Sequence, residues 1–199
     1  EAEALEILKK VNNESEAQSI LSDIKNTLIV KTNSALTYGW GLIIIGILLS
    51  VFQQFVGINV VLYYAPEIFK TLKLGTDAAL LQTIIVGIVN FLFTIVAVNT
   101  VDNYGRKPLM FIGAVGMAVA MIALGFAFYA EIGGYAALIC MMVYVAAFAL
   151  SWGPVTWVLL AEIFPNDIRN KAMPIAVAAQ WLSNWLVSAT FPLMNENSY

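Results

Sequence analysis

The residues with the clearest chemical potential are amides set in an apolar stretch, residues 50–70, which reads SVFQQFVGINVVLYYAPEIFK. Gln53, Gln54 and Asn59 each carry hydrogen-bond donors and an acceptor without a charge. Burying such a group without a partner costs roughly 2 to 7 kcal/mol, so these amides must face polar groups, water or a ligand. Paired donors and acceptors without charge suit a neutral ligand that is rich in hydroxyl groups.

These three amides can share one site only if the helix that carries them is interrupted. At about 100° per residue, a regular helix would spread their side chains over its whole circumference. Gly57 lies between them, and Pro66 removes a backbone donor further along the same segment. We therefore predict a bend or unwinding near residues 57–59. The alternative is that the amides join neighbouring helices, as amides often do in membranes.

A second interruption is predicted at Gly153 and Pro154, within the stretch SWGPVTWVLLAEIFP. Irregular backbone at membrane depth is tolerated only where it is buried in protein or lines a cavity. Other uncharged polar and aromatic side chains occur in the same apolar regions, namely Asn90, Trp157, Gln180, Trp181 and Asn184. Amides bind hydroxyl groups, and aromatic faces cover the C–H side of a ring. This combination predicts a cavity for a neutral polyhydroxy compound.

The composition indicates which elements must position these residues. The 199 residues are 60% hydrophobic and 12% charged, against roughly 45 to 50% apolar and about 25% charged in soluble domains. About 20 apolar residues cross a bilayer as a helix. We therefore predict an all-α polytopic membrane protein with five spans, at about 38–70, 77–101, 107–130, 132–164 and 172–195.

The basic residues orient these spans, because Lys and Arg are enriched on the cytoplasmic side. Connecting segments on one side hold Lys9, Lys10, Lys25, Lys31, Arg106, Lys107, Arg169 and Lys171, whereas those on the other hold Lys70 and Lys73. Residue 1 is therefore predicted to be cytoplasmic. Residues 1–37 have apolar residues at helical spacing on either side of Asn12 and Asn13. We predict a cytoplasmic insert of short amphipathic helices, either docked against the membrane domain or part of a solvated linker.

Several functional classes are not expected from the composition. The chain has no histidine and one cysteine, which removes the commonest general base and metal ligand. We predict no enzymatic activity, no metal site and no cofactor. The net charge of -3 and the lack of a basic cluster also argue against a nucleic-acid partner.

Several motifs in order along the chain resemble the sugar porters of the major facilitator superfamily, above all the bacterial proton-coupled members. They are Q-Q-x-x-G-I-N-x-x-x-Y-Y at 53–64, D-x-x-G-R-K at 102–107, G-P-V-x-W at 153–157, E-x-x-P-x-x-x-R at 162–169 and A-Q-W at 179–181. The resemblance implies the C-terminal half of a twelve-helix transporter: the cytoplasmic insert (1–37) and helices 7 to 11 (38–199). Helices 1 to 6 and 12 would lie outside these residues.

The resemblance also implies a function, a location and partners. A neutral monosaccharide such as D-xylose or a D-glucose-like sugar would cross the cell inner membrane by alternating access, with proton symport. The partners would be the sugar, the lipid bilayer and the N-terminal six-helix half. A facilitative sugar uniporter, a membrane sugar sensor and a structural helical subunit remain the alternatives.

Residue roles follow from the same resemblance. The implied sugar contacts are Gln53, Gln54, Asn59, Asn90, Trp157 and Gln180, with Trp181, Tyr63 and the backbone of Gly153 beside the sugar. Tyr63 and Tyr64 would form an extracellular gate. Asp102, Arg106, Glu162 and Arg169 would form a cytoplasmic gate. Asn170 stands where the family usually has glycine, and we expect it to keep a left-handed turn.

Overall fold

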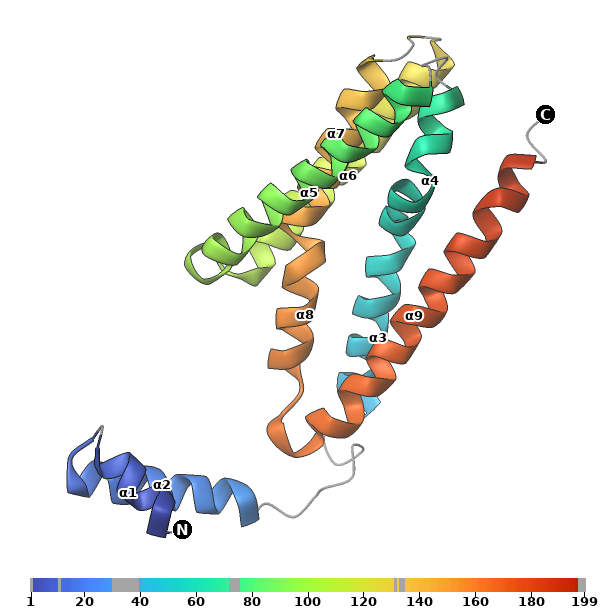
Figure 1. Cartoon of the computed structure of the whole chain (residues 1–199). Helices are drawn as coiled ribbons and strands as arrows, with labels where there is room; N and C mark the ends of the chain where they lie inside the picture. The colour runs from blue at the N-terminus through green and yellow to red at the C-terminus, as the bar shows by residue number, and fades with distance from the viewer. Residues whose placement is uncertain are drawn as a thin grey trace.

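The computed structural model describes residues 2–10, 12–29, 40–71, 76–130, 132 and 135–196. Every regular element in these residues is a helix, as predicted (Figure 1). In chain order the helices are α1 (Ala2–Lys9), α2 (Glu14–Ile29), α3 (Trp40–Phe55), α4 (Ile58–Thr71), α5 (Thr76–Tyr104), α6 (Arg106–Tyr129), α7 (Tyr135–Leu150), α8 (Trp152–Ile163) and α9 (Asn166–Glu196).

The first two helices form a small separate unit. They are divided at Asn12 and Asn13, as the sequence predicts, and the Lys9 ammonium donates a hydrogen bond to the Glu14 carboxylate across the division. Among the described residues, α1 and α2 contact only each other (Figure 1). Docking against the membrane domain therefore stays a prediction.

Four helical stretches are long and apolar enough to cross a membrane: Trp40–Tyr64, Leu81–Tyr104, Arg106–Tyr129 and Tyr135–Ile163. They correspond to the first four predicted spans. The fifth predicted span, 172–195, lies within α9, whose 31 residues are sufficient in length. Polar residues such as Gln180 and Asn184 lower the hydropathy of α9, so α9 is not among the four. That fifth span stays a prediction.

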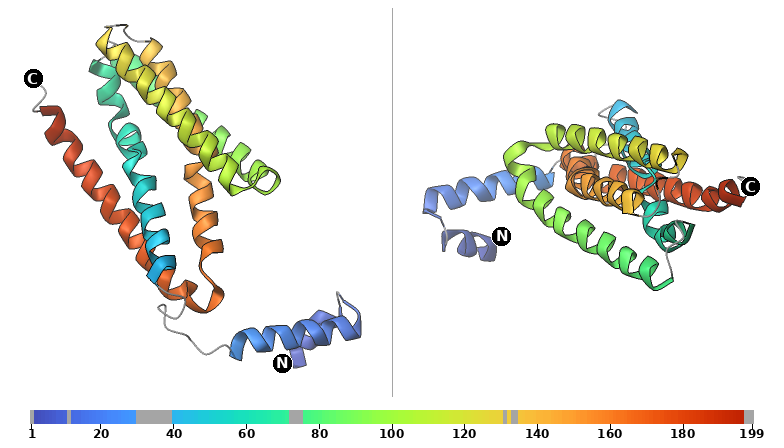
Figure 2. Two further views of the ribbon diagram at one scale, coloured as in Figure 1. Left: turned by 180° about the vertical axis from the view of Figure 1, so that it is seen from behind. Right: turned by 90° about the horizontal axis from the view of Figure 1, so that it is seen from above.

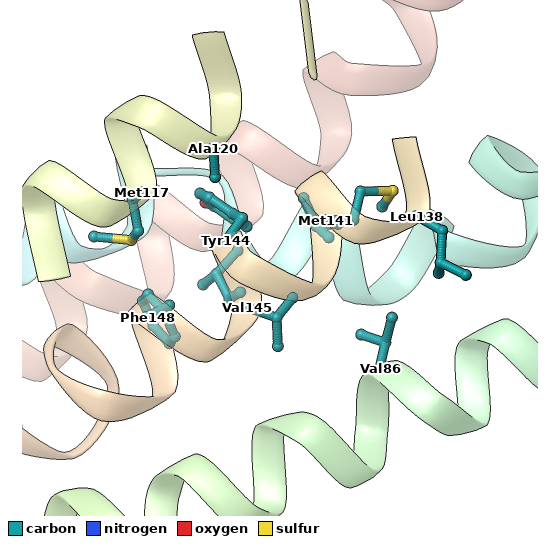
Figure 3. Close-up of a cluster of buried hydrophobic side chains, with 10 residues drawn as sticks. Val86, Met117, Ala120, Leu138, Met141, Tyr144, Val145 and Phe148 are labelled. Atoms are coloured by element: carbon teal, nitrogen blue, oxygen red, sulfur yellow. The ribbon is translucent and has the colours of Figure 1, made fainter. Parts of the chain in front are cut away.

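The described helices are arranged around two larger apolar cores, and a third, small one consists of Val101, Leu109 and Val155. The upper core joins α4, α5, α6 and α7 and consists of Ile58, Val61, Val86, Met117, Ala120, Leu138, Met141, Tyr144, Val145 and Phe148 (Figure 3). The lower core joins α8 and α9 to α3 and consists of Leu160, Phe164, Ile168, Ala172 and Ala176. Close packing at the lower core requires glycine at Gly46, where a Cβ atom would overlap the Phe164 ring.

Two helix interruptions lie between these cores. The first separates α3 from α4, and the second separates α7 from α8. Figure 2 shows α3 beside α9, while α5, α6 and α7 run together as a second body. Both interrupted helices therefore pass from one core to the other, so the interruptions place irregular backbone near the middle of the molecule.

Candidate functional site

The first interruption is centred on Gly57, as predicted. α3 ends at Phe55, α4 begins at Ile58, and Gly57 has a φ angle of 85°. Glycine adopts this left-handed backbone conformation without the steric cost that a Cβ atom imposes. The Gly57 amide donates to the Gln54 carbonyl at 2.9 Å, which closes a turn at the end of α3. This turn lets residues on either side of the interruption face each other.

The interruption brings the predicted amides into one hydrogen-bonded chain. Asn59 Nδ2 donates to Gln54 Oε1 at 2.6 Å, and Gln54 Nε2 donates to Gln53 Oε1 at 2.5 Å. From α9, Gln180 Nε2 donates to the same Gln53 oxygen at 3.1 Å. We call these four residues the amide cluster. Its members come from α3, α4 and α9, so it joins three helices at the level of the interruption.

The amide cluster retains hydrogen-bonding capacity. The Gln180 Oε1 atom is buried and has no partner among the described residues. One helical turn before Gln53, the buried Ser50 hydroxyl is also without a partner there. Buried polar atoms are nearly always satisfied in folded proteins, so this pair beside the four amides leaves hydrogen-bonding capacity that a ligand or water could use. The environment is neutral, because the cluster itself carries no charge.

The structure does not bring the other predicted sugar contacts into this chain of hydrogen bonds. Asn90 is half-buried on α5, where its backbone carbonyl accepts a bond from Thr94 at 2.8 Å. The three aromatic side chains predicted at the sugar are exposed in this chain: Trp157 by 38%, Tyr63 by 58% and Trp181 by 62%. Their roles at a sugar site therefore stay predictions.

Tyr64 has a different environment from Tyr63. Its hydroxyl donates to the Ser188 carbonyl at 3.3 Å, and its ring centroid lies 5.0 Å from that of Phe191. These contacts join α4 to α9 above the amide cluster. The extracellular gate predicted for Tyr63 and Tyr64 stays a prediction, but among the described residues only Tyr64 is joined to another helix by contacts of this kind.

The second interruption lies slightly earlier than predicted, at Ser151 rather than at Gly153 and Pro154. Ser151 separates α7 from α8, and its hydroxyl donates to the Ala147 carbonyl at 2.6 Å. Pro154 instead occupies the first turn of α8, where a proline costs little because backbone N–H groups have no helical partner there. Gly153 approaches the Phe148 ring, which a Cβ atom would meet at 3.2 Å. Its role beside the sugar stays a prediction.

Contacts from α6 support the second interruption. The Trp152 indole donates to the Met110 carbonyl at 3.1 Å. Gly113 faces Ser151 so closely that a Cβ atom would overlap the serine side chain. A small residue at this crossing is therefore required for α6 to approach the interruption, as is common between helices in membranes.

Three of the four predicted cytoplasmic gate residues meet at the ends of α5, α6 and α8. Arg106 Nε lies 3.1 Å from both carboxylate oxygens of Glu162, and its Nη2 lies 2.7 Å from Glu162 Oε1. The same Nη2 lies 3.0 Å from Asp102 Oδ1. Gly105, at a φ angle of 82°, forms the turn that places Asp102 and Arg106 together. We call Asp102, Arg106 and Glu162 the ionic cluster.

The fourth predicted gate residue lies outside this cluster. Arg169 Nε donates to the Phe164 carbonyl at 3.2 Å, and no ion pair of Arg169 is found among the described residues. The nearby carbonyl at the end of α8 provides a local acceptor. Asn170 is also not in a left-handed turn, because α9 begins at Asn166 and contains Asn170. That expectation was wrong, since the turn is completed before Asn166.

One residue at the site was not predicted from the sequence. Tyr144 of α7 is 1% exposed, and its hydroxyl donates to the Val56 carbonyl at the first interruption. A buried tyrosine hydroxyl usually has a partner, so a tyrosine in an apolar run indicates that some polar group lies nearby. The sequence does not indicate which one, because Val56 is 88 residues away.

Comparisons with known proteins give a consistent assignment. The sequence model of the sugar (and other) transporter family matches residues 1–199. The D-xylose-proton symporter of Escherichia coli is 60% identical over 97% of this chain and 40% of its own length. The glucose facilitated diffusion protein of Zymomonas mobilis is 45% identical over 96% of this chain and 41% of its own length.

Solved structures agree with the sequence comparisons. The proton:xylose symporter XylE bound to 6-bromo-6-deoxy-D-glucose superposes with a TM-score of 0.84 at 58% identity, covering 98% of this chain and 42% of that chain. This chain thus spans about two fifths of the length of the relatives that it matches. The family, the apolar helices and the structural match together identify the chain as part of a multi-pass inner-membrane protein of the sugar (and other) transporter family in the major facilitator superfamily.

Proposed function

We propose that this chain belongs to a transporter that binds a neutral monosaccharide at the amide cluster and moves it across the inner membrane by alternating access. The observation that carries this proposal is the hydrogen-bonded chain Asn59–Gln54–Gln53–Gln180, which ends in a buried acceptor that has no partner among the described residues. A carboxylate or an ammonium would favour a charged solute, whereas this cluster provides only amide donors and acceptors.

The way in which the site would bind a sugar follows from the hydrogen-bond donors and acceptors of these amides. Each sugar hydroxyl both donates and accepts a hydrogen bond, and the Gln180 Oε1 atom can accept one directly. The bond between Asn59 and Gln54 and the one between Gln54 and Gln53 use groups that can exchange partners when a hydroxyl enters. Sugars that lack a hydroxyl at the matching position would leave an amide unpaired, so the cluster would discriminate among them.

D-xylose or a D-glucose-like sugar is the proposed substrate, and proton symport is the proposed mode. The two relatives differ here, since one is named a D-xylose-proton symporter and the other a glucose facilitated diffusion protein. The higher identity to the symporter supports the coupled mode. Uniport and a sensor without transport become outcomes of the experiment below.

A first six-helix half is the proposed partner of this chain within the same protein. Alternating access requires two bodies that move about a shared site. Trp157 and Trp181, whose predicted roles are at the sugar, are exposed here and would be covered by the other half. We further propose that the sugar is carried without chemical change, so the protein is not an enzyme and requires no cofactor.

Reconstitution of the complete transporter in liposomes tests this proposal. We expect uptake of radiolabelled D-xylose or D-glucose above that of empty vesicles, stimulated by an inward proton gradient. Uptake that ignores the gradient would indicate uniport, and binding without uptake would indicate a sensor. The 199-residue chain alone is the matched control, and we expect no uptake from it because half of the site is outside it.

A further inference from the structure

Tyr144 occupies an unusual place for a polar group. It lies in the middle of α7, within the upper core, and is 1% exposed (Figure 3). Its neighbours in that core include Met117, Met141 and Phe148, which offer no strong hydrogen-bond partner to a hydroxyl. The hydroxyl instead reaches the Val56 carbonyl at 2.5 Å.

The Val56 carbonyl needs this donor because of the first helix interruption. In an uninterrupted helix the carbonyl of residue 56 would accept the N–H of residue 60. Here the helix ends at Phe55 and restarts at Ile58, and the Val61 N–H bonds to the Gly57 carbonyl at 3.2 Å. The Tyr144 hydroxyl therefore takes the place of a backbone donor. Left unpaired, this partly buried carbonyl would destabilise the conformation.

The position of Val56 connects this bond to the amide cluster. Val56 lies between Gln54, the last amide before the interruption, and Asn59, the first amide after it. The bond between Asn59 Nδ2 and Gln54 Oε1 requires a particular offset of α4 relative to α3. Holding the carbonyl midway between them restricts that offset. Tyr144 thus acts on the amides through the backbone and does not touch them.

The helix that carries Tyr144 also ends in the second interruption. Ser151 lies two helical turns beyond Tyr144, and Phe148, one turn beyond it, contacts Gly153. The body formed by α5, α6 and α7 therefore supports both interruptions. A conformational change at the first interruption would therefore reach α7 directly, through the bond between Tyr144 and Val56.

We propose that Tyr144 is a positioning residue for sugar binding: by holding the Val56 carbonyl, its hydroxyl sets the conformation of the first interruption and aligns Gln54 with Asn59. This inference rests on the proposed function, because it assumes that the amide cluster binds the sugar. The part that concerns the backbone conformation does not depend on the sugar and can be tested separately.

The substitution Tyr144→Phe in the complete transporter removes the hydroxyl and keeps the ring. We expect D-xylose to bind about three- to tenfold more weakly, which corresponds to the loss of one hydrogen bond. We also expect amide hydrogen exchange to increase in residues 55–61 and not elsewhere in α3 and α4. The matched control is Tyr135→Phe on the same helix, since Tyr135 is 75% exposed; its affinity and exchange should equal those of the wild type.

A second pair of variants separates positioning from general stability. Met141→Ala truncates a buried neighbour in the same core and should lower the melting temperature while leaving the affinity of the folded protein within twofold of the wild type. Gly57→Ala should weaken xylose binding at least threefold, because it strains the interruption at its positive φ angle although no atom lies within 4 Å of the added Cβ. That variant keeps the test available if Tyr144→Phe does not fold.

Two results would overturn the inference. One is a Tyr144→Phe protein that melts earlier but binds xylose like the wild type, and the other is unchanged exchange in residues 55–61. A wild-type transporter that binds no monosaccharide would instead overturn the proposed function. In that case the exchange measurement alone would decide whether Tyr144 holds the interruption.

Discussion

The amide cluster and the ionic cluster both join helices that are distant in sequence, but they do so with opposite chemistry. The amide cluster is neutral, and Gln53, Gln54 and Gln180 are buried. The ionic cluster is charged and partly exposed, with side-chain exposures of 27% for Arg106, 47% for Glu162 and 78% for Asp102. The cost of removing charge from water explains this division. Neutral polar groups are found where burial is deep, and charges lie at the helix ends.

This difference predicts different consequences of mutation. A missing partner in the buried cluster leaves amides unpaired, which costs more than losing a bond that water can replace. A missing partner in the exposed cluster is partly compensated by solvent and salt. We therefore expect the amide cluster to control affinity and the ionic cluster to control the balance of conformations.

Replacing Gln54 with Ala in the complete transporter should have the largest effect. Gln54 is the central member of the amide chain, because it donates to Gln53 and accepts from Asn59. Its loss should cost about 1 to 3 kcal/mol of sugar binding, or about 5- to 150-fold in dissociation constant. Titration calorimetry with D-xylose measures this change.

The control for that variant is Leu160→Ala, which truncates a fully buried residue of the lower core. Leu160→Ala should lower the stability by about 2 to 5 kcal/mol and leave the affinity of the folded protein nearly unchanged. If Gln54→Ala behaves like Leu160→Ala, the amides only join helices and the binding site lies elsewhere.

Replacing Arg106 with Ala should have an intermediate effect on conformation and none on the sugar site. Arg106 makes every contact within the ionic cluster, so its removal should shift the population toward an inward-open state by about fivefold, for about 1 kcal/mol. Spin-label distances across the cytoplasmic helix ends report the shift. Sugar binding in detergent should persist while transport falls.

The neighbouring exposed residue Lys107 provides the matched control, because Lys107→Ala removes the same charge outside the ionic cluster. A comparable shift from Lys107→Ala would attribute the effect to net charge. Loss of sugar binding by a folded Arg106→Ala protein would contradict its assignment to the gate.

The two carboxylates of the ionic cluster should differ in a smaller but measurable way. Glu162 contacts Arg106 through both of its oxygens, whereas Asp102 makes one contact and is more exposed. Glu162→Gln should therefore shift the conformational balance more than Asp102→Asn, whose effect should stay below about twofold. The same spin-label distances compare them. An Asp102→Asn effect equal to that of Glu162→Gln would show that geometry matters less than charge.

The smallest expected effect concerns Glu14 in the N-terminal unit. Its hydrogen bond with Lys9, together with the positive charge of Lys9, lowers the pKa of the Glu14 carboxyl below its ordinary value of 4.5. A lowered folded pKa means that this contact stabilises the pair at neutral pH and is lost as the pH falls through the lowered pKa. In Lys9→Ala the pKa of Glu14 should return toward 4.5, as carbon NMR of the carboxyl group would record. An unchanged pKa would contradict the contact between Lys9 and Glu14.

The interruptions show how far the sequence predicts this fold. Gly57 identified the first one correctly. A positive φ angle is a property of a single residue, and glycine is the residue that adopts it without steric cost. Pro154 placed the second one too late, since proline fits the first turn of a helix as well as it ends one. The sequence therefore predicted both interruptions, and tertiary packing of α6 against Ser151 determined where the second one lies.

The sequence predicted the site residues whose own chemistry shows their role. It predicted less well those whose role depends on a partner far away in the sequence. The amides could be grouped because an unpaired amide is costly at membrane depth. The motif resemblance placed Arg106 and Glu162 in one gate, and the structure joins them. Arg169 instead donates to the Phe164 carbonyl, so its place in the gate stays a prediction. Tyr144 was missed because its partner is a main-chain atom, which no side-chain pattern reveals.

The most direct test of the central claim is a structure of the complete transporter with bound D-xylose or D-glucose. We expect hydroxyl oxygens of the sugar to lie within hydrogen-bonding distance, about 2.7 to 3.2 Å, of amide atoms of Gln53, Gln54, Asn59 and Gln180. The Gln180 Oε1 atom, which has no partner within the described part of the chain, should accept one of these bonds. A sugar bound elsewhere, with the four amides still bonded only to one another, would contradict the assignment of the sugar site to the amide cluster.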